Sequence, residues 1–161
     1  MLESAAALFG GAMLLGAGTV LDAETARFCI LAGAKFLVSP SLTLSVIEMG
    51  SRYGIPVLCG AMTPTEVVAA WSAGAACVKV FPADALGGPQ YIRSLKRVLP
   101  HVELMPMGGV SLASANDYLE AGSFALGIGS DLVPPTADRN RIEERAHAFK
   151  EVIVNARRGG Q

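Results

Sequence analysis

The chain has 161 residues, of which 52% are hydrophobic and 17% are charged, a balance that excludes disorder and favours one folded domain with a substantial core. The formal net charge is −1 and no basic patch is evident, which speaks against nucleic-acid binding. The three cysteines show no C-x-x-C spacing, so neither a disulfide framework nor a metal site is expected. Without a secretory leader or a bilayer-spanning apolar run, the pattern predicts a cytoplasmic protein that does not act at membranes.

Helical and strand-like patterns alternate along the chain. Helices are expected to end at glycine or proline, at Gly33, Gly54, Gly74, Pro100 and Gly122, which are 21, 20, 26 and 22 residues apart. Strands alternating with helices of about 10 to 15 residues predict βα units and a parallel sheet. We expect strands over residues 13–16, 36–39, 57–59, 77–81, 103–106 and 125–128, and helices over 2–9, 23–31, 43–53, from 63 onward, 89–99, 113–121 and 140–156.

Two of these helices begin with capping residues. Asp22 is a suitable N-cap for the helix over 23–31. The run Thr63-Pro64-Thr65-Glu66 places threonine at the N-cap, proline at N1 and glutamate at N3, which is a capping box. Six parallel strands fit either a doubly wound sheet or part of an eight-stranded barrel. In both architectures ligands bind beyond the carboxyl ends of the strands.

Lys79 lies inside a buried-strand pattern, Cys77-Val78-Lys79-Val80-Phe81, which Pro82 ends. Burial disfavours the ammonium form, so it lowers the pKa of a lysine and leaves a nucleophilic amine near neutral pH. Such an amine can form a Schiff base with a carbonyl substrate. Catalytic groups collect at this end of the strands in α/β barrels. The structural alternative is an edge lysine whose head group reaches solvent.

Two glycine turns, Gly108-Gly109 and Gly129-Ser130, follow the last two predicted strands. Glycine lets backbone N–H groups approach an anion, and a following helix N-terminus adds a favourable dipole. Phosphate sites after the seventh and eighth strands are common in eight-stranded barrels, whereas the alternative is two plain turns. Small hydroxyl residues and aspartate after a strand usually form turns or cap loops, although an aspartate there can also carry a proton. Thr19, Ser39 and Asp84 take such positions.

Six segments of the chain together resemble one known family. They are Gly16-Ala17-Gly18-Thr19-Val20, Val38-Ser39-Pro40, Thr63-Pro64-Thr65-Glu66, Lys79-Val80-Phe81-Pro82-Ala83, Gly108-Gly109-Val110-Ser111 and Ile128-Gly129-Ser130. They cover Leu15 to Val133 almost without a gap, and the ordered set with Lys-x-Phe-Pro-Ala is specific. The set resembles the KDPG/KHG aldolases, the class I 2-keto-3-deoxy-6-phosphogluconate aldolases.

The resemblance implies an α/β fold of the (β/α)8 TIM-barrel type and a homotrimer that needs no cofactor or metal. It implies reversible cleavage of a 2-keto-3-deoxy-6-phospho sugar acid to pyruvate and glyceraldehyde 3-phosphate. The implied site roles are the Schiff-base lysine for Lys79, binding of the pyruvate carboxylate for Thr19, the pocket wall for Pro40 and Phe81, and phosphate binding for Gly108, Gly109, Gly129 and Ser130.

The chain departs from the family in two respects. The six predicted strands would be the third to eighth of the barrel, so residues 1–161 would form a single incomplete barrel domain. The family's second strand carries a general acid/base glutamate and an arginine, which Glu3 on a predicted helix cannot replace. A general acid/base contributes about 10²–10⁴-fold in rate, so impaired activity is expected. The second departure is Met107, where gluconate-type members have threonine and galactonate-type members an apolar residue, which leaves the epimer open.

Three functions therefore remain in competition. The first is a class I aldolase, impaired by the absence of the glutamate strand. The second is a non-catalytic phosphate-binding protein of the same fold. The third, another phosphate-binding barrel enzyme, is disfavoured by the Lys79 segment.

Overall fold

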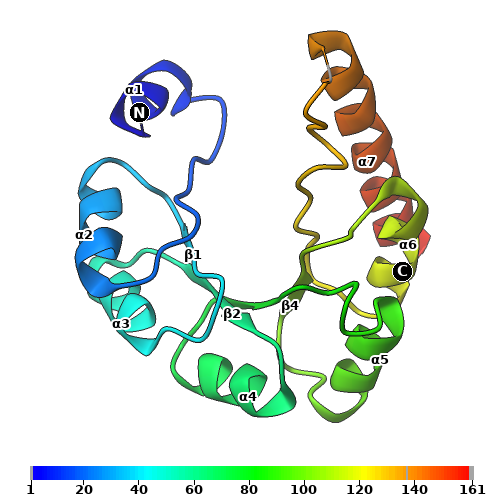
Figure 1. Cartoon of the computed structure of the whole chain (residues 1–161), viewed down its shortest axis with the longest axis horizontal. Coiled ribbons are helices and arrows are strands. Elements are labelled where there is room, and N and C mark those ends of the chain that lie inside the picture. The colour runs from blue at the N-terminus through cyan, green and yellow to red at the C-terminus, as the bar shows by residue number, and fades with distance from the viewer. Residues whose placement is uncertain (1, 137, 160–161) are drawn as a thin grey trace. The chain divides into compact units, whose positions relative to one another are not determined.

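The structure is a computed structural model that describes residues 2–136 and 138–159. Helices and strands alternate from β1 to α6 as the sequence predicts, and the strands follow the order β1-β2-β3-β4 (Figure 1). The elements are α1 Leu2–Phe9, α2 Ala23–Leu31, β1 Leu37–Val38, α3 Leu44–Tyr53, β2 Val57–Ala61, α4 Pro64–Ser72, β3 Cys77–Val80, α5 Pro89–Val98, β4 Leu104–Pro106, α6 Leu112–Glu120 and α7 Arg139–Gly159.

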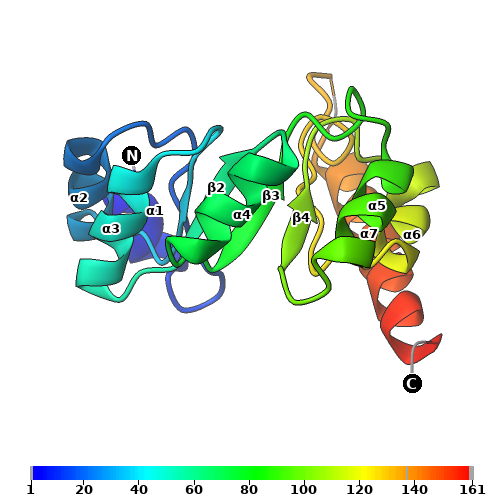
Figure 2. The ribbon, with the colours of Figure 1, turned by 90° about the horizontal axis from the view of Figure 1, so that it is seen from below.

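The chain divides into two compact units, residues 1–79 and 80–161, with the boundary inside β3. In the first unit, β1 pairs in parallel with β2, and Leu37 lies opposite Val57. Ala76, directly before β3, donates its N–H to the Val57 carbonyl at 2.9 Å and so joins β3 to β2. Helices α2 and α3 lie side by side (Figure 2), and α4 packs on β2. Their buried residues Val46, Ile47, Val67 and Ala70 build this core.

The second unit contains the end of β3, β4 and three packed helices. Met107, directly after β4, donates its N–H to the Val80 carbonyl at 3.0 Å. Helix α6 packs against α5 and, more extensively, against α7. Tyr118 of α6 and Phe149 of α7 are buried in this core together with Leu104 of β4. The predicted alternation of strand and helix thus holds from β1 to α6, where four of the six predicted strands form.

The two outermost predicted strands are shorter than expected. Residues 13–16 and 125–128 form no strand of their own; isolated parallel bridges pair Ala17, directly after the first segment, with Leu37, and Gly127 of the second with Met107. The physical reason is glycine at or beside the pairing position, since Gly127 forms one bridge and Gly16 precedes the other, and glycine weakens a strand. A Cβ atom on Gly16 would lie 2.3 Å from the Phe36 ring, and one on Gly127 would lie 2.5 Å from the Met107 methyl group. Side chains of the neighbouring segment therefore fill the space beside the backbone there.

Both predicted helix caps are confirmed. Asp22 accepts a hydrogen bond from the Thr25 N–H at 2.6 Å, and this bond is the main reason that the pKa of its carboxyl lies below the ordinary value. The capping box of α4 is complete, because Glu66 accepts from the Thr63 N–H at 2.8 Å while the Thr63 hydroxyl accepts from the Glu66 N–H at 3.3 Å. None of the helices over residues 2–136 and 138–159 is long and apolar enough to cross a membrane.

Candidate functional site

Lys79 occupies the third position of the four-residue strand β3, in which every residue is buried. Only 7% of Lys79 is exposed, and its flanking residues Val78 and Val80 are fully buried. Burial lowers the pKa of Lys79 from its ordinary value, because the surrounding apolar side chains solvate the ammonium poorly. The strand environment therefore favours the neutral, nucleophilic amine that Schiff-base chemistry requires.

The turn that contains Thr19 is strained. Thr19 has a φ of 57°. Among the described residues it is the one residue other than glycine that has a left-handed backbone. A β-branched residue in this region is a rare outlier and costs about 1–3 kcal/mol. The next residue fixes the conformation, since the Val20 N–H donates to the Val38 carbonyl at 3.1 Å and Val20 is buried. Strain that the surroundings hold in place is typical of ligand-binding positions.

Pro40, in the loop after β1, lies against the backbone of β2 at Gly60. A Cβ atom on Gly60 would be 2.2 Å from the Pro40 carbonyl, so only glycine allows this approach. Ser39, which is fully buried, accepts a hydrogen bond from the Gly60 N–H at 3.3 Å and donates one to the Ser41 carbonyl at 2.9 Å. Ser39 is therefore more than the turn former that its sequence position predicts, because its hydroxyl joins the loop after β1 to strand β2.

The Gly108-Gly109 turn packs against the segment that follows β3. Both glycines have left-handed backbones, with φ of 90° and 69°. A Cβ atom on Gly108 would lie 3.1 Å from the Pro82 Cα, and one on Gly109 would lie 2.4 Å from the Asp84 Cβ. The Ala83 N–H donates to the Met107 carbonyl at 2.8 Å and the Asp84 N–H to the Gly108 carbonyl at 3.3 Å. Phe81 precedes this segment and is 36% exposed.

Asp84 caps its own loop, as its position after a strand predicts. Its Oδ1 accepts a hydrogen bond from the Ala85 N–H at 2.9 Å. Burial and, to a smaller extent, the charge of Asp84 raise the pKa of the Tyr118 hydroxyl, which keeps this buried phenol neutral. The carboxylate therefore lies beside the Gly109 turn and within electrostatic reach of α6.

The Gly129-Ser130 turn is held at the start of α6. The Gly129 carbonyl accepts from the N–H groups of Leu132 and Val133, both at 3.0 Å. The next side chain, Asp131, accepts from the Leu112 N–H at 3.1 Å through Oδ2. Leu112 is the first residue of the helix that follows the Gly108-Gly109 turn. One carboxylate thus brings the two predicted anion-binding turns together.

Asp131 also forms an ion pair that sequence reasoning missed. Its Oδ1 lies 2.5 Å from the Arg145 Nη2, and the Arg145 Nε donates to the Asp131 carbonyl. The two side chains are only 28% and 24% exposed. Arg145 lies on α7, 14 positions further along the chain, and no local motif links it to the turn.

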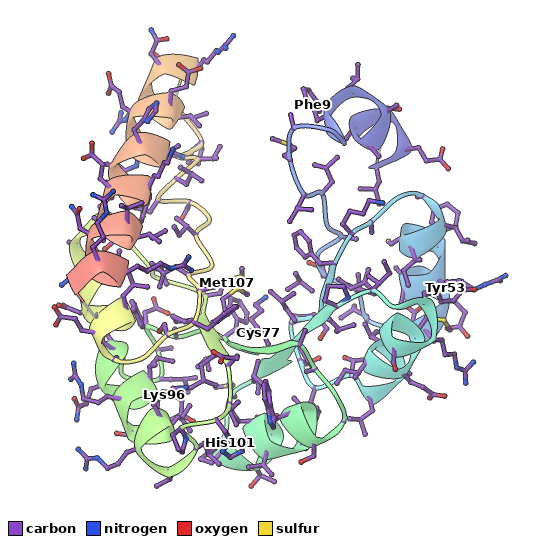
Figure 3. All side chains as sticks on the ribbon, turned by 180° about the vertical axis from the view of Figure 1, so that it is seen from behind. Phe9, Tyr53, Cys77, Lys96, His101 and Met107 are labelled. Carbon is purple, nitrogen blue, oxygen red and sulfur yellow. The ribbon has the colours of Figure 1, made fainter. Side chains whose placement is uncertain are left out.

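The predicted site residues are thus distributed over both units. Each lies in or shortly after a strand or bridge, which is the predicted position. In the second unit, the Asp131 carboxylate links the two glycine turns. The side chain of Met107, which is labelled in Figure 3, lies against Gly127. No group of three or more His, Cys, Asp or Glu side chains is arranged to hold a metal ion within the described parts of the chain. Thr19, Pro40 and Lys79 belong to the first unit, and Phe81, Gly108, Gly109, Gly129 and Ser130 to the second.

Comparison of the sequence with known proteins matches one family model, described as KDPG and KHG aldolase, over residues 10–145. The chain is 37% identical over 149 residues to the 2-dehydro-3-deoxy-6-phosphogalactonate aldolase of Escherichia coli (strain K12), covering 92% of the chain and 72% of that protein. It is 36% identical to a probable enzyme of the same name from Rhizobium meliloti, covering 91% of the chain and 69% of that protein.

Solved structures give the same result for the fold. A structure described as native KDPGal superposes with a TM-score of 0.91 at 34% identity, covering 98% of the chain and 76% of that protein. A KDPG aldolase from Legionella pneumophila, captured with pyruvate as a covalent carbinolamine intermediate, superposes with a TM-score of 0.73 at 28% identity, covering 94% and 71%. The 3-hexulose-6-phosphate synthase of Salmonella typhimurium, at 17% identity and a TM-score of 0.78, shares the fold alone, covering 96% and 79%.

Proposed function

Because the chain belongs to the KDPG and KHG aldolase family, with an α/β fold of the TIM-barrel type, we propose that it acts as a class I aldolase through Lys79. The observation that carries this proposal is a lysine buried in β3 whose pKa is lowered by burial. The amine attacks the keto carbon of the substrate and water leaves, which gives a protonated imine. As the C4 hydroxyl loses its proton, the C3–C4 bond breaks, its electron pair passes to the imine, and glyceraldehyde 3-phosphate leaves as the aldehyde. The enamine of pyruvate that remains on Lys79 takes a proton at C3, and hydrolysis of the imine releases pyruvate and the free amine.

The remaining site residues supply binding. In this proposal Thr19 holds the pyruvate carboxylate, and its strained backbone is part of that arrangement. Pro40 and Phe81 form the apolar wall of the pocket. Backbone N–H groups of the two glycine turns bind the phosphate beside the N-terminus of α6. These turns are formed by Gly108, Gly109, Gly129 and Ser130.

We propose a 2-keto-3-deoxy-6-phospho sugar acid as substrate, with the galactonate epimer preferred over the gluconate epimer. Two relatives that match most of the chain are named phosphogalactonate aldolases. Met107 supplies an apolar side chain at the position where gluconate-type members of the family have threonine. Met107→Thr should shift preference toward the gluconate epimer. The measurement is the initial rate of borohydride-trapped adduct formation at Lys79 with each epimer; an unchanged ratio of the two rates would contradict the assignment.

Turnover by this chain alone is proposed to be slow. Glu3, the acidic residue that precedes the first predicted strand, is exposed on α1. A general acid/base contributes about 10²–10⁴-fold in rate and Glu3 does not lie at a strand end, whereas imine formation depends first on Lys79. The second candidate function, a non-catalytic phosphate-binding protein, is favoured by the same observation. Measurable cleavage of the phosphorylated keto acid by this chain would eliminate it.

Trapping with borohydride tests the central assignment. Pyruvate and borohydride should add one reduced adduct, which peptide mass spectrometry places at Lys79. Lys35, which is exposed, and Lys96, whose Nζ donates to the Pro100 and Val102 carbonyls at 2.8 and 2.9 Å, are internal controls that should stay unmodified. A folded protein in which Lys79 stays unmodified would refute the proposal.

A symmetric oligomer in the cytoplasm, specifically a homotrimer, completes the proposal. One 33% identical structure with a TM-score of 0.91 is described as a cage designed by fusing symmetric oligomeric domains. Helix α2 carries large exposed apolar side chains, Phe28 at 74% and Leu31 at 65%, which is unusual for a surface that remains in water. Light scattering coupled to size exclusion should give three times the 16.7 kDa chain mass.

A further inference from the structure

The Gly129-Ser130 turn carries an apparent electrostatic conflict. A turn proposed to bind a phosphate dianion is followed directly by Asp131, whose carboxylate lies at the N-terminus of α6 and accepts from the Leu112 N–H at 3.1 Å. A helix favours an anion at its N-terminus, so the Asp131 carboxylate competes there with the phosphate of a ligand. Like charges this close weaken anion binding unless another group neutralises one of them.

Arg145 is placed to remove this conflict. Its Nη2 lies 2.5 Å from the Asp131 Oδ1, and its Nε donates to the Asp131 carbonyl. One guanidinium thus contacts both the side chain and the backbone of the same residue, in the forked geometry that arginine favours. About three quarters of each side chain is buried, with exposures of 24% and 28%, so solvent screens the pair less than a surface ion pair.

We infer that Arg145 is a positioning residue for phosphate binding: it neutralises Asp131 and thereby lets the Gly129-Ser130 turn accept a phosphorylated substrate. This inference rests on the proposed function and adds a determinant of phosphate specificity. Asp131 then has a structural task, to join the turn to α6, and Arg145 has an electrostatic one. Neither residue touches the reacting carbon.

The variants separate charge from structure. Arg145→Gln leaves the Asp131 charge uncompensated, whereas the double variant Asp131→Asn/Arg145→Gln removes the charge while the asparagine oxygen can still accept from the Leu112 N–H. Both lose the guanidinium contact to the Asp131 carbonyl, so a difference between them reports the charge. Arg139→Gln is the matched control, because Arg139 starts the same helix and pairs with Glu143 at 3.0 Å while 89% exposed.

The measurement is the dissociation constant of glycerol 3-phosphate, a phosphate ester without a keto group, by titration calorimetry of the full chain. Arg145→Gln should weaken binding by about tenfold, a Coulomb effect reduced for partial exposure. The double variant should return to within about threefold of the unchanged protein, Arg145→Lys should fall between, and Arg139→Gln should have no effect. Circular dichroism and the urea midpoint establish that each variant is folded.

The outcomes distinguish this inference from the proposed function. Equal affinities of Arg145→Gln and the unchanged protein would overturn it, and so would a double variant as weak as the single one, which indicates a structural role alone. Pyruvate trapping at Lys79, run on the same samples, should be unaffected by either variant. If the unchanged protein traps no pyruvate, the proposed role of Lys79 fails. If it traps pyruvate but binds no glycerol 3-phosphate, the proposed phosphate site and the inference about Arg145 fail while the role of Lys79 stands. If it does both and Arg145→Gln binds as tightly, the inference fails alone.

Discussion

The side chain of Asp84 occupies the space in which a Cβ atom on Gly109 would have to lie. The separation would be 2.4 Å from the Asp84 Cβ, and Gly109 also has a left-handed φ of 69°. Gly109→Ala should therefore lower the free energy of unfolding by about 2–4 kcal/mol, from backbone strain and overpacking together. Urea denaturation measures this loss.

Two further variants divide that loss into its causes. Asp84→Gly/Gly109→Ala removes the atoms that clash and should recover the steric part, leaving the backbone strain. Gly129→Ala is the control, since nothing lies within 4 Å of a Cβ atom there and its backbone is not left-handed. It should change the free energy of unfolding by less than about 1 kcal/mol. Equal losses at both glycines would contradict the close packing of Asp84.

Lys79 should make the free energy of unfolding rise with pH in the alkaline range. Burial lowers its pKa in the folded state, so between that pKa and the unfolded value of 10.5 the unfolded chain binds more protons. The free energy of unfolding should therefore rise with pH across this window, and the destabilisation is fully present below the folded pKa. Lys79→Met should raise stability at neutral pH and reduce the slope in the alkaline range, while it abolishes pyruvate trapping.

Lys79→Arg provides the opposite test. An arginine stays protonated throughout the accessible pH range, so it should destabilise the protein at every pH and also prevent trapping. Urea denaturation at a series of pH values covers both variants. If Lys79→Met left the alkaline slope unchanged, the pH dependence would have to come from another group.

Thr19 should show a trade-off between stability and ligand binding. Thr19→Gly relieves the left-handed strain of about 1–2 kcal/mol but adds backbone entropy of about 0.5–1 kcal/mol to the unfolded chain, so stability should stay equal or rise slightly. Pyruvate binding should weaken because the hydroxyl is lost. Thr65→Gly, in the first turn of α4, should instead cost about 0.5–1 kcal/mol and leave pyruvate trapping unchanged. A large loss of stability in Thr19→Gly would argue against strain at this position.

Removal of the Ser39 hydroxyl alone should lower the stability of the protein. Ser39→Ala leaves the Gly60 N–H without the acceptor that now lies 3.3 Å away, at a buried site. The expected cost is about 1–3 kcal/mol in the free energy of unfolding. Ser94→Ala serves as control, because the Ser94 hydroxyl bonds the Gln90 carbonyl on an exposed helix face; its effect should be within about 0.5 kcal/mol.

Local signals predicted most of the fold. The N-cap Asp22 and the capping box Thr63–Glu66 begin helices at the expected residues, because a cap is satisfied by atoms within three positions of it. The buried strand around Lys79 followed from the apolar residues on both sides of the lysine. The strands over 13–16 and 125–128 came out as single bridges, because glycine weakens a strand and Gly16 and Gly127 pack against the side chains of Phe36 and Met107.

The parts of the site that escaped prediction depend on contacts between distant residues. Ser39 and Gly60 are 21 positions apart, Leu112 and Asp131 are 19 apart, and Asp131 and Arg145 are 14 apart. No spacing rule in the sequence links such pairs, since each depends on how a loop returns to a neighbouring strand or helix. For the bond between Ser39 and Gly60, the sequence offers only a serine between Val38 and Pro40, and such a serine indicates a turn as readily as a buried hydroxyl.

The glycine contacts at the two outer segments have a consequence for local opening. The Ala17 amide bonds the Phe36 carbonyl at 3.1 Å, and three further backbone hydrogen bonds join residues 15–20 to residues 35–38. The Gly127 amide bonds the Pro106 carbonyl at 2.8 Å, and beside it one backbone bond, from the Phe124 amide to the Leu104 carbonyl, joins the second segment to β4. Fewer bonds therefore have to break before the Gly127 amide meets solvent. In deuterated water Gly127 should lose protection before Ala17 and Leu37, in a fluctuation that leaves the interior of each unit intact.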